Sequence, residues 1–200
     1  MIYILEHSFL EHYLTIIRKQ PTYSHFKYSW SKISNIVATL VTKDFNLVDT
    51  FDESGEFAGY KFQDNYTIIS IFPNGIQLAK AFTENIPNSK SGYLGYSFGI
   101  ETNDNIEETL CLLPEDISTT KVILCDAIVK TGNTVKNALS RLQIENVPEI
   151  SVVSVFSTTD GVENIRAEFP QVPIYVCALE TMEEIEKISF VDIYLRYYNL

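Results

Sequence analysis

The sequence predicts an α/β protein in which a parallel sheet is flanked by helices. Three apolar, β-branched runs in the second half of the chain, residues 121–126, 150–157 and 173–179, are typical of strands buried on both faces. Between the first two runs, residues 135–142 place apolar side chains at helical spacing. Alternation of strand and helix implies parallel strands joined by right-handed crossovers.

The first half of the chain predicts helices followed by strands. Apolar residues recur three or four positions apart over much of residues 10–40, and Pro21 interrupts the pattern, so two helices are expected. Charged residues and glycines over residues 49–59 predict a loop. Aromatic and β-branched residues at 57–62 and 66–72 then predict two strands.

Shorter elements connect these strands to the second half. Residues 75–82 predict a short helix, and residues 93–100 predict a strand. The polar stretch 101–108 indicates an exposed loop or flap. Asp160 and Glu163 have the spacing of a capping box, which predicts the start of another helix.

Length and charge limit the classes of function. Two hundred residues are expected to form one domain over residues 1–200, with enough core to need no disulfides. The net charge of -11 argues against a protein that binds along the phosphates of a nucleic acid. A small anionic ligand is still compatible, because backbone N–H groups or a divalent metal ion can hold phosphate in a negative field.

Cysteine usage and hydropathy predict a cytoplasmic protein. Cys111, Cys125 and Cys177 are an odd number without a C-x-x-C pair, which favours a reducing compartment. No apolar run approaches the roughly 18 residues of a spanning helix, so no membrane association is expected. His7 and His12 have no companion ligands, so no protein-held metal is expected either.

The turn after the strand that ends at Asp126 is the strongest candidate site, because ligands bind beyond the carboxyl ends of such strands. Small and hydroxylated residues there would expose backbone N–H groups at a helix N-terminus, which suits a phosphate dianion. Asp126 could accept hydrogen bonds from ribose hydroxyls, so a ribose 5-phosphate group is expected. The other reading is that Thr131 only caps the helix and Gly132 relieves a tight turn, because the P-loop and dinucleotide signatures are absent.

Three segments resemble the uracil phosphoribosyltransferase family. The run VILCDAIVKTGNT is similar to that family's loop for phosphoribosyl pyrophosphate (PRPP), in which an apolar strand and an acid precede T-G-G-S. The segment HYLTIIRKQ resembles the family pattern H-K-L-x-x-x-R near the N-terminus. The segment DGVENIRAEFPQVPIYVCALE is similar to a family pattern with E-G, H-P and Y-x-A. The resemblance therefore extends along most of the chain.

The resemblance implies a fold, an activity and partners. The fold would be a phosphoribosyltransferase-like parallel sheet flanked by helices, with N-terminal helices and a β flap. The activity would be transfer of phosphoribose from Mg-bound PRPP to a pyrimidine base, giving a nucleoside monophosphate, by a homodimer. Asp126 would be the catalytic residue that orients ribose. The 5-phosphate would be held by Lys130, Thr131, Gly132, Asn133 and Thr134. The diphosphate would be held by the loop Pro73, Asn74 and Gly75 through the backbone N–H groups that this loop offers.

Three departures from the family pattern bear on activity. Pro73 stands where the diphosphate loop P-I-L-R-A-G has its arginine, and Gly99 stands where the flap has a second arginine. The family's uracil-binding G-L-G-D-A-G-D has no counterpart in ISFVDIYLRYYNL, whose tyrosines predict packing instead. Uracil turnover is therefore expected to be weak or absent unless another cation substitutes. The candidate substitutes are Lys80, Lys90, Lys130 and Arg196.

Two further functions stay open at this stage. The first is a catalytically inactive relative that binds PRPP or a nucleotide as a sensor or as the partner subunit of an active enzyme. It is favoured by the retained Thr131–Thr134 segment beside the lost diphosphate and base elements. The second is an enzyme with a changed acceptor, in which the new C-terminal segment forms a different base site.

Overall fold

A mostly parallel sheet forms the centre of the molecule, and seven of its strands are hydrogen-bonded one beside the next. The computed structural model describes residues 1–19, 21–98 and 106–188. In spatial order the strands are β1 (Ile2–Ile4), β10 (Ile174–Leu179), β9 (Glu149–Ser157), β7 (Lys121–Cys125), β4 (Tyr66–Phe72), β5 (Lys90–Phe98) and β6 (Ile106–Leu112). All neighbours along this path are parallel except β5 and β6. The predicted α/β class with a parallel sheet is therefore confirmed.

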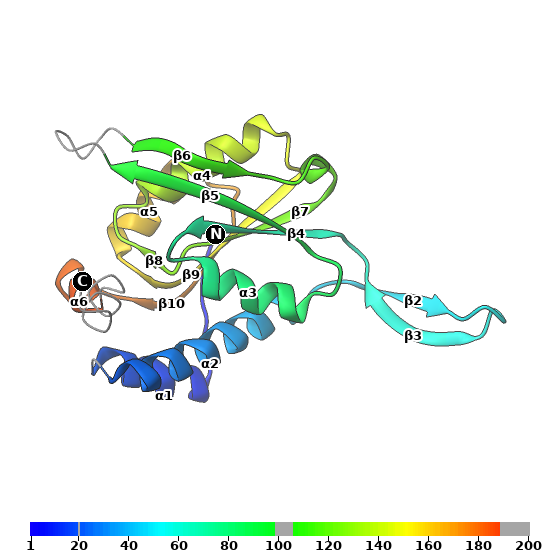
Figure 1. Cartoon of the computed structure of the whole chain (residues 1–200), viewed down its shortest axis with the longest axis horizontal. Coiled ribbons are helices and arrows are strands. Elements are labelled where there is room, and N and C mark those ends of the chain that lie inside the picture. Colours follow the sequence, from blue (N-terminus) through cyan, green and yellow to red (C-terminus); the bar gives the residue numbers. More distant parts are fainter. Residues whose placement is uncertain (20, 99–105, 189–200) are drawn as a thin grey trace.

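Two smaller strand pairs complete the β structure. The two-residue strand β8 (Ile128–Val129) pairs with the end of β9, directly after the central strand β7. The strands β2 (Leu47–Phe51) and β3 (Phe57–Phe62) form an antiparallel hairpin of their own. Figure 1 shows this hairpin projecting from the rest of the molecule.

Helices cover both faces of the sheet (Figure 1). They are α1 (Ser8–Arg18), α2 (Tyr23–Thr42), α3 (Ile76–Asn85), α4 (Asn133–Ile144), α5 (Thr159–Glu168) and α6 (Met182–Lys187), with a short 3-10 helix at Ile117–Thr119. Buried side chains of α1, α2 and α3 belong to one core cluster, and those of α4 and α5 belong to a second. The strands separate these two clusters because successive side chains point to opposite faces.

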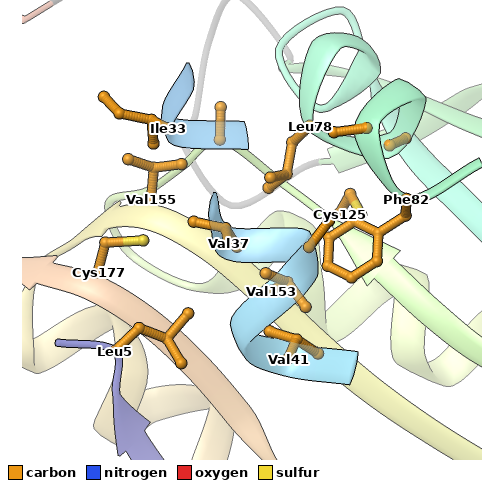
Figure 2. Packing of buried hydrophobic residues seen from close by; sticks show 14 of the residues in the cluster. Leu5, Ile33, Val37, Val41, Leu78, Phe82, Cys125, Val153, Val155 and Cys177 are labelled. Carbon is orange, nitrogen blue, oxygen red and sulfur yellow. The ribbon is translucent and has the colours of Figure 1, made fainter. Parts of the chain in front are cut away.

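The core beneath α2 and α3 shows why the sequence folds in this way. Figure 2 shows Val37 of α2 and Phe82 of α3 packed with Val153 and Cys177 of the sheet. Val37, Phe82 and Val153 are fully buried, and each such side chain contributes about 1.5–3 kcal/mol. Trp30, which lies within the helical apolar pattern of residues 10–40, also belongs to this core, since only 4% of its surface is exposed. The helical spacing read from residues 10–40 thus describes the faces that pack on the sheet.

Four strands were not predicted, and one of them is the two-residue strand β8, which lies in the turn expected after Asp126. β1 has three residues and lies at the sheet edge, paired only with β10, so its sequence carries almost no periodic signal. β2 begins at Leu47 and includes Asp49, so the prediction of a loop from residue 49 was wrong as far as Phe51. β6 begins at Ile106, and the loop predicted as far as Glu108 was wrong there, because this edge strand turns its charged residues outward.

Helix starts differ from the prediction in two places. Asp160 and Glu163 do not form the predicted capping box, because α5 is capped two residues earlier by Thr158, whose Oγ1 accepts from the N–H of Gly161. The capping box lies instead at Thr181, the N-cap of α6.

Candidate functional site

A cavity of about 280 Å³ lies at the carboxyl ends of β4 and β7, where the sequence predicted the site. Seven of the predicted site residues line it, namely Pro73, Asn74, Asp126, Lys130, Thr131, Gly132 and Thr134. Gly75 and Asn133 are not part of the lining. Tyr96 of β5 and Val135 of α4 also line the cavity, and neither was selected from the sequence because both have the pattern of core residues.

Asp126 directly follows β7 and is 6% exposed. Burial disfavours the charged carboxylate and raises the pKa of Asp126 to about 7, although hydrogen bonds from the backbone at Ile128 and Ala127 oppose this shift. The strand itself fixes the position, because the Asp126 N–H donates to the carbonyl of Val153 on β9. The cavity therefore contains a rigidly held acid that titrates near neutral pH.

The segment Lys130–Thr134 turns from β8 into α4. Gly132 is the N-cap of α4 with φ at 80°, a left-handed conformation that glycine adopts without strain. The N-cap is therefore Gly132 and not Thr131. The expectation that Gly132 relieves a tight turn agrees with its positive φ. The Thr131 Oγ1 instead accepts a long hydrogen bond of 3.4 Å from the N–H of Asn133. The first-turn N–H groups of α4 thus lie beside the cavity with the positive end of the helix dipole.

The start of α5 supports this turn from behind. The Thr158 hydroxyl donates to the carbonyl of Lys130, and the Asn164 amide donates to the carbonyl of Thr131 at 2.7 Å. A Cβ on Gly132 would lie 2.4 Å from the carbonyl oxygen of Gly161, so the two backbones touch directly. Sequence reasoning missed these contacts because α5 follows the turn by some thirty residues; the only local signal was the glycine at position 161.

The loop after β4 offers fewer donors. Pro73 has no N–H, and the bond that precedes it, Phe72–Pro73, is cis. The N–H of Gly75 is already used, because it donates to the carbonyl of Ile71 at 2.8 Å. A Cβ on Gly75 would lie 2.1 Å from the carbonyl oxygen of Cys125, which explains the glycine as a packing requirement. Among the residues that the structure describes, the Asn74 N–H donates to no other group.

Positive charge at the cavity is limited to one side chain in the described lining, Lys130. Lys80 pairs with Glu84 one turn further along α3, and Lys90 pairs with Asp116 at the opposite end of β5. Neither lysine lines the cavity, so neither substitutes for an arginine there. Gly99, Arg196 and the C-terminal tyrosines lie outside the described residues.

The residues that the structure describes contain neither a cluster of metal ligands nor a membrane-spanning helix. Across 1–19, 21–98 and 106–188, no three side chains of His, Cys, Asp or Glu come close enough together to hold a metal ion. Within the described helices, none combines the length and apolar character that crossing a membrane requires. Asp126 is the only carboxylate of the described cavity lining.

The architecture identifies the class of protein. A solved protein from Aquifex aeolicus shares the fold with a TM-score of 0.79 and 20% identity, over 90% of this chain and 88% of its own. The adenine phosphoribosyl transferase of Trypanosoma brucei, solved with AMP, pyrophosphate and ribose-5-phosphate, aligns with a TM-score of 0.55 and 11% identity over 76% of this chain and 68% of its own. The fold is that of the phosphoribosyltransferases.

Sequence comparisons identify the family within that class. The uracil phosphoribosyltransferase family pattern matches residues 4–189. The uracil phosphoribosyltransferase of Dictyoglomus thermophilum is 29% identical over 184 residues, which are 90% of this chain and 88% of the relative. That of Finegoldia magna is 26% identical over 181 residues, covering 88% and 86%. The chain belongs to the uracil phosphoribosyltransferase family, and the suspected resemblance is confirmed.

Proposed function

We propose that the chain, as a single domain over residues 1–200, transfers phosphoribose from PRPP to a pyrimidine base at the cavity between β4 and β7. The observation that carries this proposal is the turn Lys130–Thr134, whose free backbone donors and helix N-terminus border the same cavity as Asp126. The turn would hold the 5-phosphate, as helix N-termini hold other phosphate groups. Asp126 in its ionised form would accept hydrogen bonds from the ribose hydroxyls.

Magnesium would enter with the substrate in this scheme. Mg²⁺ is usually held by one or two carboxylates together with the phosphates of the substrate, and Asp126 can supply one carboxylate oxygen. The ion would neutralise part of the diphosphate charge as the bond to ribose breaks. Because the phosphates would supply most of the ligands, this scheme does not require a cluster of metal-binding side chains in the protein.

The diphosphate side supports only a slow reaction. Donors aimed at the departing diphosphate act where negative charge develops, and removal of one such donor typically lowers the rate about 100- to 1,000-fold. The loop Pro73–Gly75 leaves Asn74 as its one free backbone donor, and Lys130 is the one cation of the described lining. The same observation favours a second candidate function, a catalytically inactive relative that binds PRPP or a nucleoside monophosphate as a sensor or partner subunit.

We also propose a homodimer that forms through the hairpin β2–β3. Phe51, Phe57 and Tyr60 are each more than half exposed on this projecting hairpin, which is unusual for large aromatic side chains unless another surface covers them. We propose that a second copy of this chain covers these side chains in a homodimer. The double substitution Phe51→Ser and Phe57→Ser should shift the sedimentation coefficient to that of a monomer. An unchanged sedimentation coefficient would contradict this interface.

We further propose a cytoplasmic location, which the three free cysteines support.

Calorimetry and an activity assay together test the proposed function. The purified chain is titrated with PRPP, UMP and ribose 5-phosphate, with and without Mg²⁺, and is then assayed for conversion of radiolabelled uracil to UMP. Binding with slow turnover supports the transferase. Binding without turnover favours the inactive relative, and absence of binding to all three ligands contradicts both.

A further inference from the structure

Two consecutive carbonyl groups of the turn Lys130–Thr134 are turned towards α5. The carbonyl oxygen of Lys130 accepts from the Thr158 hydroxyl. The carbonyl oxygen of Thr131 accepts from the Nδ2 of Asn164 at 2.7 Å. Both donors come from α5 or its N-cap, so one face of the turn is anchored by side chains that are remote in sequence.

The anchored carbonyls determine where the neighbouring N–H groups point. The peptide units in this turn are trans, so in each unit the N–H points away from the C=O. The N–H of Thr131 shares its unit with the carbonyl of Lys130, and the N–H of Gly132 shares its unit with the carbonyl of Thr131. Both N–H groups therefore point away from α5, on the side of the turn where the 280 Å³ cavity lies. Neither group donates to another described residue.

The orientation of the Asn164 amide is itself determined. Its Oδ1 accepts from the ammonium of Lys136 at 3.2 Å, and an ammonium can only donate. The Nδ2 must then face the turn, where it also donates to the Oδ1 of Asn133 at 3.1 Å. Lys136 is in turn held by Glu168 at 2.8 Å. A partly buried chain of polar contacts thus presents one donor to the carbonyl of Thr131.

We propose that Asn164 is a positioning residue for anion binding, which holds the Thr131–Gly132 peptide so that its N–H faces the cavity. This inference rests on the proposed function of the turn. Asn164 does not reach the cavity lining, so it acts through the backbone and not by touching the ligand. Thr158 contributes in the same way, but it also caps α5, so its replacement would mix two effects.

Two substitutions at Asn164 separate positioning from packing. Asn164→Asp keeps the shape and the contact with Lys136, but it replaces the donor by an acceptor that repels the carbonyl of Thr131. Asn164→Ala removes the donor without adding charge. The loss of one hydrogen bond changes an equilibrium constant by up to about tenfold, so both variants should bind ribose 5-phosphate about tenfold more weakly.

A matched control is available on the neighbouring helix. Asn137 lies on α4 beside Lys136 and Glu168, and its amide donates only within its own helix, to the carbonyl of Asn133. Asn137→Asp adds the same charge near the same lysine. It acts on the carbonyl of Asn133 inside α4 and leaves the Thr131–Gly132 peptide without a new contact. It should leave the affinity for ribose 5-phosphate within about twofold of wild type, as expected for a screened surface charge.

The experiment combines calorimetric titration of ribose 5-phosphate, melting temperature and ¹⁵N–¹H spectra of the full chain. We expect both Asn164 variants to lose affinity, with shifted amide signals of Thr131 and Gly132 already in the free protein and a melting temperature close to that of Asn137→Asp. Wild-type affinity and wild-type amide signals in both variants would overturn the inference alone. A purely structural role is shown by a lowered melting temperature with unchanged affinity. If the wild-type chain itself binds no ribose 5-phosphate, the proposed function fails first, and the positioning role for anion binding fails with it.

Discussion

Two turns at the carboxyl ends of adjacent strands border the same cavity and differ sharply in what they can hold. The turn after β7 and β8 has a left-handed glycine, a helix N-terminus and carbonyls tied back to α5. The loop after β4 has a proline without an N–H and a glycine whose N–H is already used. The first turn leaves backbone N–H groups and a helix N-terminus facing the cavity, where we propose that a phosphate binds, and the second leaves one backbone donor free.

The difference teaches that binding and catalysis can separate within one fold. Under the proposed function, ground-state affinity for ribose 5-phosphate would depend on the first turn, whereas the rate would depend on donors that act when diphosphate departs. A chain that retains one turn and weakens the other should bind better than it reacts. Each prediction below changes one of the two turns, in decreasing order of expected effect.

Restoring an arginine to the weaker loop should have the largest effect. Pro73→Arg introduces a charged donor at an exposed position that lines the cavity, and uracil-dependent turnover should rise about 100- to 1,000-fold. Affinity for ribose 5-phosphate should change little, which a parallel titration checks. An unchanged rate in a folded variant would show that the loop does not limit the reaction.

Damage to the stronger turn should abolish most binding. Gly132→Ala places a Cβ 2.4 Å from the carbonyl oxygen of Gly161 and strains a φ of 80°, so ribose 5-phosphate affinity should fall about 100-fold. Gly55→Ala is the matched control, because Gly55 has a φ of 81° with nothing within 4 Å of its Cβ. Thermal melts and titrations of both variants separate the effect of the positive φ, which both positions share, from the effect of the Cβ contact with Gly161, which only Gly132→Ala would make. Equal binding by the two variants would argue against the close contact as the cause.

Asp126 gives the turn region a pH dependence. Its pKa is raised from 3.8 to about 7 by burial, so the folded state binds the proton more tightly than the unfolded state. The stabilisation is fully present below pH 3.8 and is lost as the pH rises through about 7. Asp126→Asn should therefore flatten the fall of unfolding free energy over this range, measured by urea denaturation at several pH values. Asp116→Asn is the control of opposite sign, because Lys90 lowers the pKa of Asp116. A wild-type slope retained in Asp126→Asn would place the titrating group elsewhere.

The smallest effect is expected at Lys130. Its exposed ammonium borders the cavity and no described residue pairs with it, so Lys130→Ala should weaken ribose 5-phosphate binding only a few-fold at low salt. Screening should remove the difference at about 1 M salt. Titration at two salt concentrations checks this, and a large, salt-independent loss would assign Lys130 a direct catalytic or binding contact.

The sequence could predict the contiguous parts of this site and not the remote ones. Strand, Asp126, small residues and helix follow one another directly, so local pattern was sufficient to place the turn. The contacts from Thr158 and Asn164 depend on how α5 packs, which no local pattern encodes. β1 was missed for the same reason, since its three residues become a strand only by pairing with β10, some 170 positions away. The reason for Gly75 likewise appears only when its backbone meets that of Cys125.

One measurement tests the separation of binding from turnover most directly: uracil-to-UMP turnover and ribose 5-phosphate affinity determined on the same wild-type preparation. We predict measurable affinity for ribose 5-phosphate together with a turnover well below the common enzymatic range of about 1 to 1,000 per second. Turnover inside that range would contradict the account, because the loop after β4 would then stabilise departing diphosphate as well as an arginine-bearing loop does.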